Sequence, residues 1–146
     1  IAAERGTAGH AVVPIRATFG TTELPLGPFA GFLSSADRPI ASLFIEVRAA
    51  LTDLAAGRPL LLVVDDIHVL DEASTALVHQ FVTDGQARLV CTARTGHQPP
   101  AAVLDLLQTG LLRRHDVAPL VDSLDANLMA ASTLDSLLFS ENPSVP

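Results

Sequence analysis

Apolar residues follow two patterns along this chain. Short, nearly continuous apolar runs occupy residues 10–18, 60–64 and 87–92, and an unbroken aliphatic run is typical of a strand buried on both faces of a sheet. Between these runs, apolar residues recur every three or four positions, as in helices that pack by one face. Strands that alternate with helices predict an α/β fold, a three-layer sandwich around a mainly parallel sheet.

Three helices are predicted, over residues 40–56, 71–83 and 99–109. Gly57 ends the first, since glycine is favoured just past a helix end, and the side chain of Asp71 can cap the second. The apolar positions expected to face the core are Ile40, Leu43, Phe44, Val47, Leu51, Leu54, Leu77, Val78, Phe81, Val103, Leu104 and Leu107.

The first thirty residues give weaker signals. Residues 1–5 are predicted to be the end of a helix, and because the first residue is not Met, the chain is expected to be a piece of a longer protein. Pro14 lacks the N–H that a sheet ladder needs, so the strand over residues 10–18 is expected at an edge. Residues 19–31 are predicted to form a loop with one helical turn, held against the core by Leu24, Leu26 and Phe29.

The C-terminal third is predicted to hold one more strand and one or two helices. The strand lies within residues 111–120, centred on residues 115–118, and the helices lie within residues 124–138. We therefore divide the chain into a domain over residues 1–131 and a helix end and tail over residues 132–146.

Composition narrows the possible functions. The 146 residues are 49% hydrophobic, enough for one core, and carry a net charge of -7, with nine arginines and no lysine. An acidic chain without a basic cluster is a poor nucleic-acid binder, and no apolar run reaches the roughly 20 residues of a membrane helix. A single cysteine, Cys91, cannot form an internal disulfide, which favours a cytoplasmic location.

The strongest chemical signal is the acidic pair Asp65 and Asp66, directly after the central apolar run. Open parallel sheets bind ligands at the carboxyl ends of their strands, and an aliphatic strand that ends in two acids has the form of a Walker B segment. Thr92 and Arg94 end the next strand, where an arginine could reach a phosphate. The alternatives are two solvated carboxylates and an ordinary surface arginine.

Other candidates carry less weight. Asp65, Asp66 and His68 could form a metal cluster, but a histidine packed over the strand end is the simpler interpretation. Cys91 is expected to be a buried apolar residue rather than a nucleophile. Ser74 and Ser132 lack the glycines of a nucleophile elbow. The short basic run of residues 113–115 is expected to be solvated.

Four segments together resemble the nucleotide-binding domain of large ATP-binding transcriptional regulators of the LuxR type, which belong to the STAND branch of the AAA-like P-loop ATPases. The resemblance spans residues 10–125 in the family's order. Its segments are Glu23 to Phe29, Gly57 to Asp71 with Ser74 to Gln80 after it, Arg88 to Gly96, and Gly110 to Arg114 with Val117 to Leu120 after it.

The resemblance implies ATP and Mg²⁺ as ligands and an on/off cycle that regulates transcription. It implies that Asp65 holds the magnesium ion, that Asp66 is the catalytic acid that orients water, and that Thr92 and Arg94 contact the nucleotide. The family's helix-turn-helix is absent from the chain, so no DNA contact is expected from it.

One departure from the family is decisive for catalysis. The chain contains no G-x-x-x-x-G-K-[ST] loop, the Walker A motif, and no strand to carry it. It is therefore predicted to be an incomplete P-loop core that hydrolyses ATP weakly or not at all. The family places the missing strand between the strand ending at Thr92 and the last strand. Without it, the last strand must pair directly with the strand ending at Thr92, detach, or find another chain.

The alternative function is a non-catalytic protein-interaction module that binds itself or a partner through an exposed sheet edge.

Overall fold

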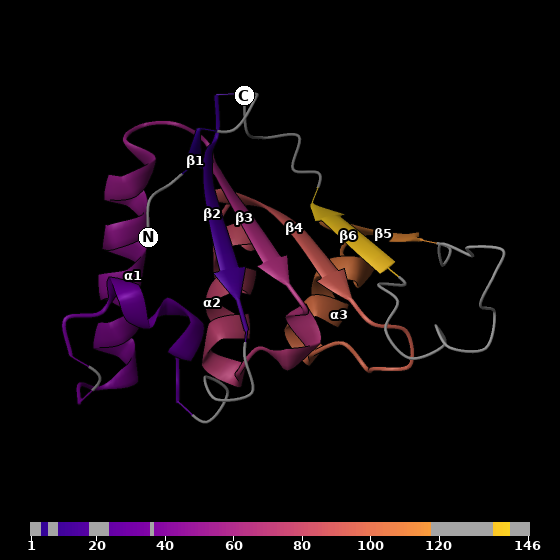
Figure 1. The fold of residues 1–146 in the computed structure, drawn as a ribbon, viewed down its shortest axis with the longest axis horizontal. Coiled ribbons are helices and arrows are strands. Elements are labelled where there is room, and N and C mark those ends of the chain that lie inside the picture. Colours follow the sequence, from indigo (N-terminus) through magenta and orange to yellow (C-terminus); the bar gives the residue numbers. More distant parts are fainter. Residues whose placement is uncertain (1–3, 6–8, 18–23, 36, 118–135, 141–146) are drawn as a thin grey trace, which may run out of the picture.

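The computed structural model describes residues 4–5, 9–17, 24–35, 37–117 and 136–140 of the chain. Their core is a six-stranded sheet in the order β1-β2-β3-β4-β6-β5 (Figure 1). The strands are β1 Glu4–Arg5, β2 Ala11–Arg16, β3 Leu60–Asp65, β4 Ala87–Ala93, β5 Leu112–Asp116 and β6 Ser136–Ser140. Strands β2, β3 and β4 are parallel neighbours, so the predicted α/β class and its parallel centre are confirmed.

The three predicted helices are present as α1 Ile40–Ala55, α2 Glu72–Thr83 and α3 Ala101–Gln108. Two short 3-10 helices, η1 Gly27–Phe32 and η2 Ile67–Val69, lie in the loops. Asp71 caps α2 as predicted, because its carboxylate accepts a hydrogen bond from the N–H of Ser74 at 2.9 Å. The left-handed turn that ends α1 begins at Ala56, one residue before the predicted stop at Gly57.

The helices cover one face of the sheet. Helices α1, α2 and α3 each follow a strand and lead to the next parallel strand in the same direction across the sheet, and right-handed crossovers then place them on one side. Figure 1 shows α2 and α3 together behind the strands. Leu62 and Val64 of β3 are fully buried, whereas Leu61 and Val63 between them are only partly buried. The described residues therefore form two layers, and they do not supply the third layer or bury β3 on both faces as predicted.

Strand β2 is not at the sheet edge, contrary to prediction. Residues Glu4 and Arg5, expected in a helix, form the short strand β1 instead and pair with Val12 and Ala11. Pro14 lies beyond this two-residue pairing, and its parallel neighbour on the other side is Val63 of β3. A proline without an N–H is tolerated there because β1 does not extend far enough to need it.

Strand β6 is the main correction to the predicted fold. Residues 136–138 were expected in a helix but belong to a strand that runs antiparallel to both β4 and β5 and lies between them. The rest of the predicted helical stretch, residues 124–135, lies outside the described residues. Because of β6, the last parallel strand neither pairs directly with β4 nor stands alone. That strand, β5, also ends earlier than expected, at Asp116, and residues 118–120 are not described.

The loop before α1 packs against the core, as predicted. Leu26 and Phe29 are fully buried, while Leu24 is 59% exposed and contributes nothing to the core. The backbone N–H of Leu26 donates to the carboxylate of Asp71 at 3.1 Å. This hydrogen bond ties the loop to the N-terminus of α2.

Candidate functional site

The two acids lie at the carboxyl end of the parallel strands, where the sequence placed the site. Asp65 is the last residue of β3, and Asp66 adopts a left-handed conformation with φ 54° and ψ 54°. This conformation is costly for most residues, but aspartate is among those that tolerate it. It ends the strand abruptly, and the carbonyl of Asp66 then accepts a hydrogen bond from Val69 that closes η2.

Thr92 of β4 holds both acids in place. Its hydroxyl donates to Asp65 Oδ1 at 2.7 Å and accepts from the backbone N–H of Asp66 at 2.9 Å. One side chain therefore fixes the carboxylate of the first acid and the backbone of the second. This links the ends of β3 and β4, and it gives Thr92 a positioning role that the strand pattern alone did not reveal.

Arg94 follows β4 at the same edge of the sheet as the acids and lies beside Asp66. Its Nε is 3.4 Å from Asp66 Oδ1, and its side chain is half exposed. The guanidinium of Arg94 is open to solvent, so it can turn from Asp66 toward a better anionic partner. The structure thus brings Asp65, Asp66, Thr92 and Arg94 together.

His68 lies beside Asp66, and its ring packs against that of His97. His68 is 6% exposed, its Nδ1 is 3.9 Å from Asp66 Oδ1, and its ring lies 4.6 Å from that of His97. Sequence reasoning missed His97, which follows Gly96 in the turn after β4 and carries no motif. Within the described ranges no group of three or more His, Cys, Asp or Glu residues could hold a metal ion, so the Asp65–Asp66–His68 metal cluster is not formed.

Burial controls the protonation of His68. Desolvation lowers the pKa of His68 below its ordinary value of 6.5, and the positive charge of Arg94 and the neighbouring His97 lower this pKa further. Asp66 opposes the shift by raising the pKa, but it does not cancel the effect of burial. His68 is therefore neutral in the folded protein at pH 7.

Stability should fall as the pH is lowered from 7 toward 5, and His68 should account for part of the loss. The unfolded chain binds a proton at His68 near pH 6.5, whereas the folded chain binds it only at lower pH, so protonation favours unfolding. We expect His68→Gln to flatten the dependence of the free energy of unfolding on pH between 7 and 5, measured by urea denaturation. The control is His79→Gln, at a histidine of α2. If His68→Gln left the dependence of the free energy of unfolding on pH unchanged, His68 would not be the group responsible.

The remaining candidates behave as their environment dictates. Cys91 is fully buried, and desolvation raises the pKa of its thiol to about 12, so it is not a nucleophile. Ser74 is also buried and donates its hydroxyl proton to Asp71. Arg113 and Arg114 are exposed on β5 as predicted.

No helix in the described part of the chain is both long and apolar enough to cross a membrane.

The resemblance implies Mg²⁺ and ATP as ligands, and the acids suit Mg²⁺ better than the site suits the phosphates of ATP. Mg²⁺ prefers carboxylate oxygens and usually takes one or two of them from the protein together with phosphates and waters. Asp65 is exposed, and Asp66 Oδ1 is buried without a hydrogen-bond partner among the described residues. For phosphate, the site offers the guanidinium of Arg94 and no lysine.

Comparisons with protein families, with curated proteins and with solved structures find no match to this chain.

Proposed function

We propose that the chain is the Walker B and sensor part of an ATP-dependent switch, a nucleotide-binding domain of a LuxR-type transcriptional regulator. The single observation that supports this most is the joining of Asp65, Asp66, Thr92 and Arg94 at the carboxyl ends of two adjacent parallel strands. Carboxylates and a releasable arginine are the groups that a magnesium-bound phosphate needs.

Each residue has a distinct part in this proposal. Asp65 faces solvent and can hold Mg²⁺ directly or through water, while Thr92 fixes one of its oxygens. Asp66 orients a water molecule, and Arg94 exchanges its contact with Asp66 for the terminal phosphate. When bound, Mg²⁺ would supply positive charge to the phosphate oxygens. Loss of the Arg94–Asp66 contact then reports the presence of nucleotide to the β3–α2 turn.

Hydrolysis by this chain should be weak or absent. The backbone N–H groups and the lysine of a Walker A loop supply most of the grip on phosphate in P-loop ATPases, and the 146 residues include neither that motif nor any lysine. Moreover, β6 lies between β4 and β5, the position in which the family carries the phosphate-loop strand, and runs antiparallel to both.

The proposal predicts magnesium-dependent binding of ATP without turnover. ATP with Mg²⁺ at 100 times its dissociation constant should add about 2.7 kcal/mol to the free energy of unfolding, or about 5–10 °C in Tm. Asp65→Asn should remove the magnesium dependence, whereas the exposed helical control Asp53→Asn should not. Phosphate release should stay at background, and a Tm unmoved by millimolar Mg²⁺ and ATP would contradict nucleotide binding.

The position of β6 favours a second candidate, a non-catalytic interaction module. A chain that completes its own sheet between β4 and β5 keeps the scaffold without the phosphate loop. Strand β5 is the outermost strand of the sheet in the described part of the chain, and a partner strand could extend the sheet there. Steady phosphate release lost in Asp66→Ala would rule this candidate out, while no response to nucleotide would favour it.

A further inference from the structure

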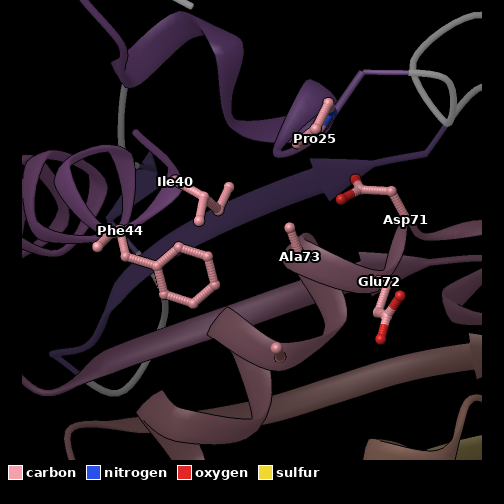
Figure 2. A pocket seen from close by; sticks show the side chains of 8 residues that line it. Pro25, Ile40, Phe44, Asp71, Glu72 and Ala73 are labelled. Atoms are coloured by element: carbon pink, nitrogen blue, oxygen red, sulfur yellow. The ribbon is translucent and has the colours of Figure 1, made fainter. Parts of the chain in front are cut away.

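A hollow opens between the N-terminal turns of α1 and α2, away from the acidic pair. Its volume is about 590 Å³, within the range of pockets that bind small molecules. Figure 2 shows Ile40 and Phe44 of α1 on one side, Ala73 of α2 facing them, and Pro25 from the loop before η1. The space exists because residues Ala41, Ala73 and Ala76 put only methyl groups where larger side chains would fill it.

One end of this pocket is acidic. Asp71 and Glu72 line it, and the described residues that line the pocket include no arginine or histidine. The carboxylate of Asp71 is already engaged, since it accepts from the backbone N–H groups of Leu26 and Ser74 and from the Ser74 hydroxyl. Glu72 is exposed, and the described residues give its carboxylate no hydrogen bond or ion pair. The pocket thus combines an apolar body with one available negative charge.

A cation is favoured at this end despite the helix N-terminus. The dipole of α2 contributes a partial positive charge of about half a unit, and the two full carboxylates of Asp71 and Glu72 exceed it. An anionic ligand would face both of them. A neutral apolar ligand would fill the cavity but leave Glu72 without a partner.

We infer that this pocket binds an amphiphilic organic cation, with an aromatic or branched apolar body between α1 and α2 and an ammonium group against Glu72. The inference does not depend on the nucleotide proposal, because no lining residue belongs to the acidic pair or to Thr92 and Arg94. Such a ligand would contact Asp71 and Glu72, at the start of the helix that follows the acidic turn.

A matched pair of probes tests the inference. The protein, labelled with ¹³C on alanine and isoleucine methyl groups, is titrated with 4-phenylbutylamine and separately with 4-phenylbutanol. We expect the amine to shift the methyl signals of Ala73, Ala76 and Ile40 saturably and to bind about five-fold more tightly than the alcohol. Glu72→Gln should abolish that preference while leaving the alcohol's affinity unchanged.

Filling the pocket supplies the control. Ala73→Leu should block both probes, and Ala41→Leu, at an exposed position of α1, provides a second filling variant with less risk to folding. Ala49→Leu, on the same helix but outside the pocket, should bind like the parent protein. Equal affinity for amine and alcohol, binding that survives both filling variants, or no shift at the pocket methyl groups would each overturn the inference.

Discussion

Replacing Leu62 with alanine is expected to lower the free energy of unfolding by about 3 kcal/mol. Leu62 is fully buried at the middle of β3, with Val13 of β2 and Leu89 of β4 as its register neighbours. Truncating a buried leucine loses its transfer free energy and leaves a cavity in the packed core. Because β3 carries Asp65 at its end, this substitution removes packing from the strand that positions the site.

The neighbouring substitution Leu61→Ala is the matched control, and we expect it to cost about 1 kcal/mol. Leu61 points to the opposite face, where it is only partly buried, so less apolar surface returns to water in the variant. Urea denaturation followed by far-UV circular dichroism measures both. Equal losses would contradict the one-sided packing, because they would require the face that carries Leu61 to be as well covered as the face that carries Leu62.

The sequence was sufficient for the parallel centre of the fold and for the acidic pair. Strands β2, β3 and β4 are nearly continuous apolar runs, and α1 and α2 keep a helical period, with a stop signal at Gly57 after α1 and a cap at Asp71 before α2. Once those strands are parallel neighbours, their carboxyl ends must share one edge of the sheet. The placement of Arg94 at the same edge as the acids follows from this topology, whereas its contact with Asp66 was not predicted.

Features that depend on long-range pairing could not be predicted in the same way. The run of β3 from Leu60 to Val64 contains no polar position that would mark an exposed face, so the partial burial of Leu61 and Val63 had no local signal. Strand β6, Ser136–Ser140, is short, its three central residues are apolar and it follows another apolar stretch, which suggested a helix up to residue 138. Only the backbone hydrogen bonds offered by β4 and β5 decide that they form a strand.

The conformation and the hydrogen bonds of the site also could not be predicted from the sequence. Nothing in the residue types predicts that Asp66 adopts a left-handed conformation or that one threonine hydroxyl serves both acids. His97 and the cavity lined by Ala73 arise from contacts between segments distant in the chain. Residue identity indicated the chemistry of the site, and tertiary packing determined which groups share it.

The placement of β6 can be tested with the natural cysteine. The register sets Leu138 opposite Cys91 across the β4–β6 pair, and paired residues of antiparallel strands have Cα atoms about 4.5–5.5 Å apart, within the range of a disulfide. Leu138→Cys should therefore form an intramolecular disulfide and raise the free energy of unfolding by about 4 kcal/mol, because it closes a long loop in the unfolded chain.

The cross-link must be formed during refolding under oxidising conditions, since burial raises the pKa of the Cys91 thiol to about 12 and leaves little thiolate in the folded protein. Mass spectrometry and a thiol assay detect the bond, and the same variant with reductant gives the stability reference.

Leu137→Cys is the control: its register partner is Thr92, so it should keep both thiols free. A disulfide in that variant but not in Leu138→Cys would mean that β6 is shifted by one residue. Two free thiols in both variants would mean that β6 does not pair with β4 in either register.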